Sequence, residues 1–195
     1  DILSDNVTLV RTGRTSNSTY FDYRYVASTG GPIDFYWSEA YEAVNVANLV
    51  IAQIDNLADG AEKDNILGQA LAIRAWAHFD LVRFYGKIPT QSADANASLG
   101  VVYIKAEDGD TEDPLAEPVR ETVASNYAEI IGDLERAAQL IGEDNGEGKL
   151  DVNGVYGLLS RVYLYNGEYQ KVIDAANKVD VELATAEDLE GRIGN

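Results

Sequence analysis

The stretch between residues 45 and 89 most constrains the fold, because its apolar residues recur at helical spacing on both sides of a short acidic break. Polar side chains interrupt the apolar ones in the first half, so one face of a helix there should be buried. The second half is apolar on nearly all sides of the helix, which predicts packing on several sides. The repeating apolar positions of the first half are Val44, Ala47, Val50, Ile51, Ile54 and Leu57.

Periodicity together with start and stop signals predicts five helices. Asp34 is the expected N-cap of the first, Gly86 ends the second, and the third should begin directly after Pro118, a favourable first-turn residue. The expected helices span residues 34–57, 62–85, 119–141, 152–165 and 169–179.

The run LYNGEYQKVIDAANKV resembles the hinge of a tetratricopeptide hairpin, with Gly167 at the tight turn and Tyr169 and Val172 facing the preceding helix. We therefore predict an all-α fold of stacked, tetratricopeptide-like helical hairpins with an irregular N-terminal segment and long loops. We expect one domain over residues 1–195, made of an irregular lead-in (1–32), a first helical hairpin (33–89), a long loop (90–117), helices three to five (118–181) and a tail (182–195).

Composition excludes several classes of function. The net charge is −18, from 33 acidic and 15 basic residues, which disfavours nucleic acid and anionic lipid headgroups as partners. The chain has no cysteine, so disulfides, thiolate catalysis and cysteine-based metal sites are excluded. It also has a single histidine and no G-x-S-x-G motif. We therefore expect no catalytic residues and no enzyme.

Two arginines and the histidine lie among apolar residues on predicted helices. A buried guanidinium must be paired, so we expect Arg74 or Arg161 to form an ion pair between helices, with Asp133 or Glu135 as the carboxylate. His78 lies four residues after Arg74 and has no orienting partner in the sequence. We interpret it as a hydrogen-bonded core residue rather than a general base.

The acidic run at residues 107–117 invites comparison with a calcium-binding EF-hand loop. If Asp108 held the first position, the sixth would be Asp113 instead of glycine and the twelfth would be Val119 instead of glutamate. The motif is therefore absent, and we predict a solvated acidic loop with no metal and no cofactor. A calcium site built in another way stays open as an unsupported alternative.

Aromatic side chains are the usual platforms for sugar rings. Most are expected in the core on helix faces: Trp37, Tyr41, Trp76, Tyr85, Tyr127, Tyr156 and Tyr163. Others gather in the irregular lead-in, interleaved with polar side chains, and loops on a rigid scaffold commonly carry binding residues. The candidate ligand-binding residues are therefore Arg14, Tyr20, Tyr23, Arg24 and Tyr25. The alternative is that this segment only packs against the helices.

Four motifs in order resemble the SusD-like (RagB/SusD) family over about residues 35–190. The first joins Trp37 and Tyr41 to the Ala-Asn at 47–48, and the second joins Arg74-Ala75 to Tyr85-Gly86-x-x-Pro89. Gly100-Val101-Val102-Tyr103 is similar to the short extended segment that follows in the family. The third motif comprises residues 120–123, Tyr127 and residues 133–137, and the fourth comprises residues 160–169.

The resemblance implies the N-terminal helical-repeat portion of a longer, non-catalytic outer-membrane lipoprotein at the cell surface. Such proteins capture an oligo- or polysaccharide and deliver it to a SusC-like TonB-dependent transporter, in starch or other glycan utilisation. The family is held at the membrane through an N-terminal lipid anchor, which we expect to be missing from this chain. The helical repeats of the family mainly face the transporter.

Two alternatives remain at this point. Relatives resembling RagB bind oligopeptides, and the −18 charge would suit a basic peptide. A generic helical-repeat adaptor for a protein partner is the alternative from another class, and it should carry polar capping helices at both ends.

Overall fold

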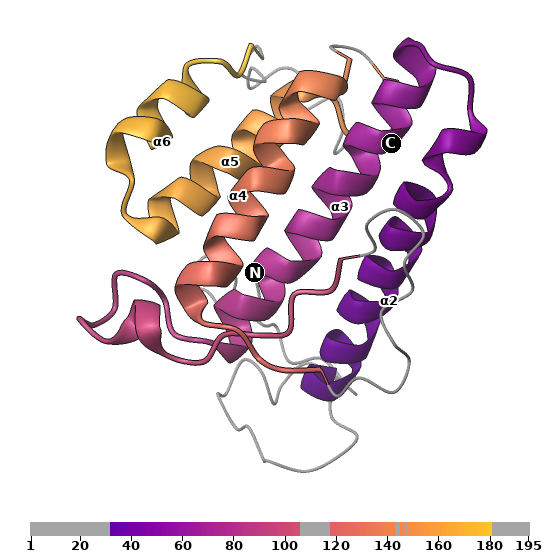
Figure 1. Cartoon of the computed structure of the whole chain (residues 1–195). Helices are drawn as coiled ribbons and strands as arrows, with labels where there is room; N and C mark the ends of the chain where they lie inside the picture. The colour runs from indigo at the N-terminus through magenta and orange to yellow at the C-terminus, as the bar shows by residue number, and fades with distance from the viewer. Residues whose placement is uncertain (1–31, 106–117, 143–144, 147, 181–195) are drawn as a thin grey trace, which may run out of the picture. The chain divides into compact units, whose positions relative to one another are not determined.

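The computed structural model describes residues 32–105, 118–142, 145–146 and 148–180. The chain divides into two units, Asp1–Tyr36 and Trp37–Asn195, and the packing below is that of the second. Five α-helices and two short 3₁₀ turns are described, with no β-strand among these residues, which confirms the predicted all-α class (Figure 1). They are α2 (Pro32–Ala52), η1 (Ile54–Asn56), α3 (Ala61–Tyr85), η2 (Ala95–Ala97), α4 (Val123–Leu140), α5 (Val152–Asn166) and α6 (Tyr169–Ala176).

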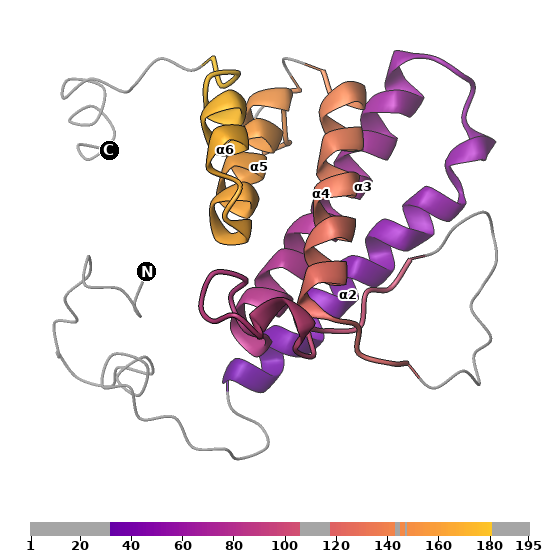
Figure 2. The same ribbon diagram turned by 60° about the vertical axis from the view of Figure 1, so that its left-hand side comes forward.

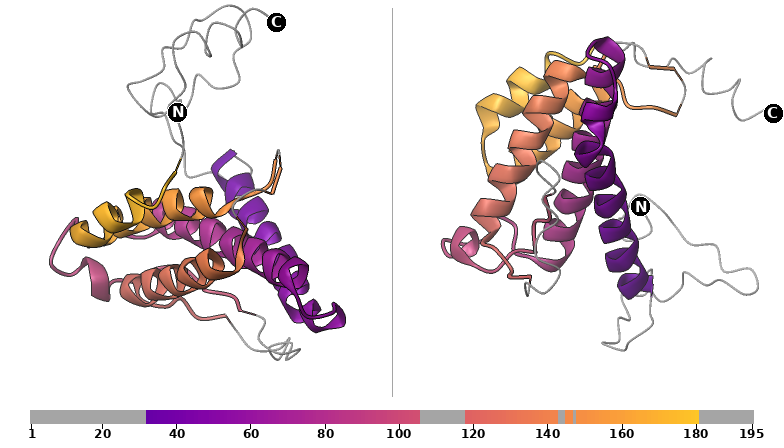
Figure 3. Two further views of the ribbon diagram at one scale, coloured as in Figure 1. Left: turned by 90° about the horizontal axis from the view of Figure 1, so that it is seen from above. Right: turned by 45° about the vertical axis from the view of Figure 1, so that its right-hand side comes forward.

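The helices follow one another side by side in chain order, from α2 to α6 (Figures 1 and 3). Helix α3 packs mainly on α4, α4 on α5, and α5 on α6 (Figure 2). The fully buried side chains Leu71, Phe79, Tyr127, Ile130 and Leu134 form the centre of the core between α3 and α4. None of the described helices is long and apolar enough to cross a membrane.

Two predicted helix starts are wrong. Helix α2 begins at Pro32, so Asp34 lies inside it and is not the N-cap. Proline suits a first helical position because its φ is fixed near the helical value and its missing N–H loses no hydrogen bond there. The sequence interpretation treated this proline only as a breaker.

Helix α4 begins at Val123 instead of directly after Pro118. The residues before it are extended, because they pair with the segment that follows η2: Gly100 N–H donates to Glu121 O at 2.7 Å, and Val123 N–H donates to Ser98 O at 2.9 Å. The hydroxyl oxygen of Thr122 then caps the helix by accepting from Ser125 N–H at 3.1 Å. Long-range pairing thus overrides the local proline signal.

The turn between α5 and α6 forms at Gly167, as predicted. Its φ of 80° lies in the left-handed region, and the next backbone N–H, of Glu168, donates to Tyr163 O at 2.9 Å. Val172 packs against the core. The prediction for Tyr169 is wrong: it begins α6, is 62% exposed, and lies about a third of a turn around the helix from the buried Ala175.

Replacing Gly167 with Ala should destabilise the fold by about 1–2 kcal/mol, because a residue with Cβ is strained at this φ. The new Cβ would also lie 3.1 Å from Thr90 Cγ2. The measurement is urea unfolding of the purified chain. Gly132→Ala is the matched control: it lies inside α4 with nothing within 4 Å of an added Cβ, and it should stabilise the helix by about 0.5–1 kcal/mol. Equal effects of the two changes would contradict the role of the turn.

Candidate functional site

A buried ion pair joins α3 to α4 at the centre of the described structure. Arg74 is 3% exposed, and its Nε and Nη2 donate to the two carboxylate oxygens of Asp133 at 2.7 and 2.8 Å. Its Nη1 donates to Asn48 Oδ1 on α2 at 2.9 Å. The predicted interhelical pair is confirmed for Arg74 with Asp133, whereas Arg161 is exposed.

The same carboxylate accepts a third hydrogen bond, from the Tyr103 hydroxyl, at 2.7 Å. Burial, reinforced by the neighbouring negative charge of Asp133, raises the pKa of Tyr103 far above its usual range. Tyr103 therefore remains a hydrogen-bond donor at any physiological pH. The other predicted carboxylate, Glu135, accepts from the Tyr163 hydroxyl at 2.6 Å on the α5 side of the same helix.

His78 is fully buried and stacks on Tyr103, with the ring centroids 3.9 Å apart. Its Nε2 lies 3.1 Å from Ile104 N–H and must accept that hydrogen bond, so Nδ1 carries the proton and donates to Arg74 O at 2.9 Å. Burial lowers the pKa of His78 to about 4, so the ring is neutral at pH 7. Both nitrogens are satisfied, which confirms the predicted core role.

The extended segment at residues 101–105 is held mainly by side chains of helices, since its backbone pairing with the residues before α4 ends at Val101. Asn126 on α4 bonds both backbone groups of Val101, accepting from its N–H at 2.7 Å and donating to its carbonyl at 3.0 Å. From α2, Tyr41 donates to Val102 O at 2.9 Å and Asn48 donates to Ile104 O at 3.0 Å. Burial raises the pKa of Tyr41 to about 12. These polar groups hold the fold together and are not available to a ligand.

The candidate ligand-binding residues from the sequence all lie outside the described residues. These are Arg14, Tyr20, Tyr23, Arg24 and Tyr25, and the acidic run at 107–117 also lies outside. They stay predictions. In the part of the chain that the structure describes, no group of three or more His, Cys, Asp or Glu side chains could hold a metal ion.

The aromatic residues predicted in the core divide into three groups. Tyr127 and Tyr163 are buried. Partly buried residues that pack against the core are Trp37, Tyr41, Tyr85 and Tyr156. Trp76 is 44% exposed, so its prediction is wrong. It follows Ile73 by three residues on α3, and Ile73 is 43% exposed, so part of this apolar helix has no cover among the described residues.

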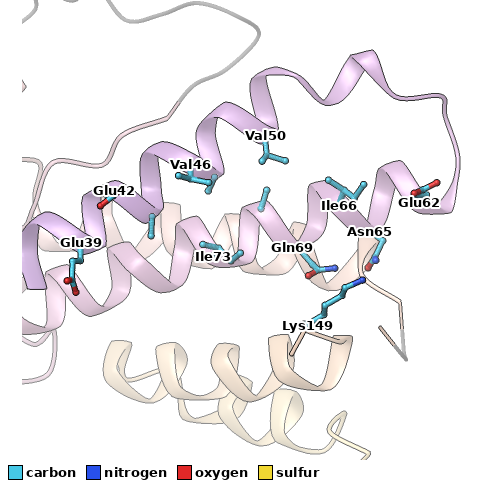
Figure 4. Close-up of a pocket in the computed structure, with 13 residues that line it drawn as sticks. Glu39, Glu42, Val46, Val50, Glu62, Asn65, Ile66, Gln69, Ile73 and Lys149 are labelled. Carbon is cyan, nitrogen blue, oxygen red and sulfur yellow. The ribbon is translucent and has the colours of Figure 1, made fainter. Parts of the chain in front are cut away.

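A groove of about 740 Å³ runs between α2 and α3 beside that face (Figure 4). Aliphatic side chains line its middle: Ala43, Val46, Ala47, Val50, Ile66, Ala70 and Ile73. Glu39 and Glu42 lie at one end, and Glu62, Asn65 and Lys149 lie at the other. Sequence reasoning treated Ala47, Val50, Ile66, Ala70 and Ile73 as packed positions and did not anticipate the groove.

A smaller pocket of about 310 Å³ lies among α4, α5 and α6. It has two tyrosine rings in its lining, but lysine ammonium groups cover both: Lys178 Nζ is 4.8 Å from the ring centroid of Tyr156, and Lys171 Nζ is 5.1 Å from that of Tyr163. Cation–π contacts of this kind stabilise the hairpin. They also occupy the ring faces on which a sugar would stack.

Replacing Arg74 with Met should destabilise the fold by about 3–5 kcal/mol, because the carboxylate of Asp133 would stay buried without its cation. Arg161→Met, at an exposed position, should change the free energy of unfolding by less than about 0.5 kcal/mol. Adding Asp133→Leu to Arg74→Met should recover part of the loss. Urea unfolding measures all three, and an Arg74→Met protein as stable as the wild type would refute a structural pair.

Stability should fall with pH below about 6.5 because of His78. Its folded pKa of about 4 lies below the unfolded value of 6.5, so the unfolded state binds more protons between these values. The contribution is complete above pH 6.5, and about 3 kcal/mol is lost as the pH falls to 4. The measurement is the free energy of unfolding as a function of pH, for the wild type and for His78→Gln. The difference between the two curves isolates the histidine, because the carboxyl groups titrate in both proteins. Parallel curves for the two proteins would contradict the assignment.

Comparison with known proteins identifies the family. The SusD-like family described as "Starch-binding associating with outer membrane" matches residues 4–164. The SusD-like protein P2 of Formosa agariphila is 26% identical over 151 residues, which cover 76% of this chain and 27% of that protein.

Solved structures agree. A putative sugar binding protein from Bacteroides vulgatus is 35% identical, with a TM-score of 0.75 over 92% of this chain and 41% of its own. A SusD superfamily protein from Bacteroides thetaiotaomicron is 31% identical, with a TM-score of 0.77 over 94% of this chain and 40% of its own. The chain thus spans about two fifths of the length of these solved relatives and about a quarter of the curated one. The resemblance seen in the motifs is confirmed, and the chain belongs to the SusD-like family.

Proposed function

We propose that the chain is part of a non-catalytic glycan-binding protein, which captures an oligo- or polysaccharide for a SusC-like TonB-dependent transporter in the outer membrane. The observation that carries the proposal is the family match over residues 4–164, which covers most of the chain. Family members bind carbohydrate and associate with the outer membrane. The proposed protein is a surface-exposed lipoprotein, held by an anchor at its N-terminus.

The chemistry of the described residues supports a role without catalysis. Arg74 and Tyr103 both donate to the carboxylate of Asp133, and both ring nitrogens of His78 are hydrogen-bonded to backbone groups. A general base needs a free acceptor within reach of a substrate proton, and this histidine offers none. The described helices therefore act as a rigid scaffold.

The linings of the two described cavities are a poor match for a sugar. The lining of the groove between α2 and α3 is mostly aliphatic, which suits a polyhydroxylated ligand poorly. The pocket among α4, α5 and α6 has its tyrosine rings covered by Lys171 and Lys178. We propose the aromatic lead-in as part of the glycan site, with Tyr20, Tyr23 and Tyr25 as stacking platforms and Arg14 and Arg24 as hydrogen-bond donors.

Calorimetric titration of the full-length protein with soluble glycans tests this assignment. Tyr20→Ala, Tyr23→Ala and Tyr25→Ala combined should weaken saccharide binding at least about tenfold, which corresponds to about 1.4 kcal/mol. Tyr169→Ala is the matched control, because Tyr169 is an exposed tyrosine on α6, and it should leave the affinity unchanged.

The same titration with oligopeptides tests the alternative of peptide capture. Binding of basic peptides without glycans would replace glycan capture by peptide capture, for which the −18 net charge is the supporting observation. Binding of neither class would refute both proposals. Co-purification of a TonB-dependent transporter with the full-length protein tests the partner separately.

A further inference from the structure

The groove between α2 and α3 is lined by two matching helix faces. On α2 the lining residues Glu39, Glu42, Ala43, Val46, Ala47 and Val50 follow the spacing 0, 3, 4, 7, 8, 11. The lining residues of α3 from Glu62 to Ile73 repeat the same spacing. This is the spacing of one continuous helix face, so two parallel rows of side chains border the groove (Figure 4).

Three of the larger apolar side chains in these rows are exposed, whereas Ala47 and Ala70 between them are buried. Val46 is 55% exposed, Val50 is 36% exposed and Ile73 is 43% exposed. The opposite side of α2 faces the core: Val44 is 0% exposed there, and Asn48 accepts a hydrogen bond from Arg74. Rows of side chains at helical spacing leave a channel that the ridge of a third helix fills. An apolar groove between two helices is also the usual seat of an amphipathic helix.

The charged residues at the ends of the groove indicate what kind of helix could bind in it. Glu39 and Glu42 close one end of the groove, whereas Glu62 and Lys149 balance each other at the other end. None of Glu39, Glu42 and Glu62 forms an ion pair with another residue of the described structure. A second copy of the chain would bring the same carboxylates and a net charge of −18, so self-association through this face is disfavoured.

We propose that this groove docks an amphipathic helix of a partner protein, with an aliphatic stripe along the groove and lysine or arginine at the end that meets Glu39 and Glu42. The aliphatic stripe fills the channel over residues Val46, Val50, Ile66 and Ile73. The cationic end pairs with the two carboxylates and fixes the direction in which the helix lies. None of the groove residues belongs to the aromatic lead-in proposed for the glycan, so the two proposals can be tested with separate variants.

Fluorescence anisotropy with two designed peptides tests the docking. Both peptides carry the same leucine stripe at helical spacing, and they differ only at one end, which has two lysines in one and two glutamates in the other. At physiological salt the lysine peptide should bind the chain with one-to-one saturation, at least about tenfold more tightly than the glutamate peptide. Absence of saturable binding by the lysine peptide would overturn the proposal.

Matched variants locate the binding. Ile73→Ser in the groove should weaken the lysine peptide at least about tenfold, while Ile173→Ser, at a similarly exposed isoleucine on α6, should not. Glu39→Gln with Glu42→Gln should abolish the preference for lysine, while Asp174→Asn with Asp180→Asn, away from the groove, should preserve it. Equal weakening by groove and control variants would mean non-specific attraction and overturn the proposal.

Two further measurements test whether a second copy of the chain, or another part of the same protein, occupies the groove instead. Concentration-dependent self-association in sedimentation that Ile73→Ser removes would assign the groove to a second copy. A cysteine placed at Ile73 that is protected from a thiol reagent in the isolated full-length protein, but reactive after unfolding, would assign it to another part of the same protein. Either result would overturn docking of a partner helix.

Discussion

The buried pair between Arg74 and Asp133 is the interaction on which the rest of the structure depends. Burying two charges is costly unless every donor and acceptor is used, because the protein interior solvates ions poorly. Here the guanidinium also donates a hydrogen bond to Asn48 on α2, and the carboxylate also accepts one from Tyr103 in the extended segment. One ion pair between α3 and α4 thereby fixes the positions of two further elements. A shift of any of these four pieces would leave a buried polar group without a partner.

The side chains of this network all lie in the sequence segments that resemble the SusD-like family. Tyr41 and Asn48 come from the first motif, Arg74 from the second, Tyr103 from the extended segment and Asp133 from the third motif, and they meet in one buried place through bonds of 2.7 to 3.0 Å. The likeness to the family is thus a likeness of scaffold: the motif residues hold helices and the extended segment in position. This explains why the family could be recognised from the sequence while its ligand could not. Residues that bind a glycan need not belong to a network whose groups are satisfied internally.

The helices were predictable because their signals are local. Apolar periodicity located α3 and α5 to within a residue or two, and Gly86 and Gly167 end them as expected. Two of the errors arise where contacts between residues far apart in the sequence determine the structure. Helix α4 starts late because the residues before it pair with the segment after η2, and Trp76 is exposed because no described element covers its face of α3. Apolar periodicity shows that a face is apolar, but only the packing shows whether something lies on it.

The two ends of the helix stack differ in the charges that lie beside their exposed side chains. A helix in the middle of the stack is covered on both sides, whereas α2 and α6 have a neighbour among the described helices on one side only. The α2 end combines exposed aliphatic residues with Glu39 and Glu42, which form no ion pair within the part of the chain that the structure describes. The α6 end alternates Lys171, Asp174 and Lys178 beside tyrosine rings, so charges of both signs are balanced there. The α2 end is therefore aliphatic and acidic, whereas the α6 end is of mixed charge, and this contrast is why the proposed cationic helix suits the groove at α2.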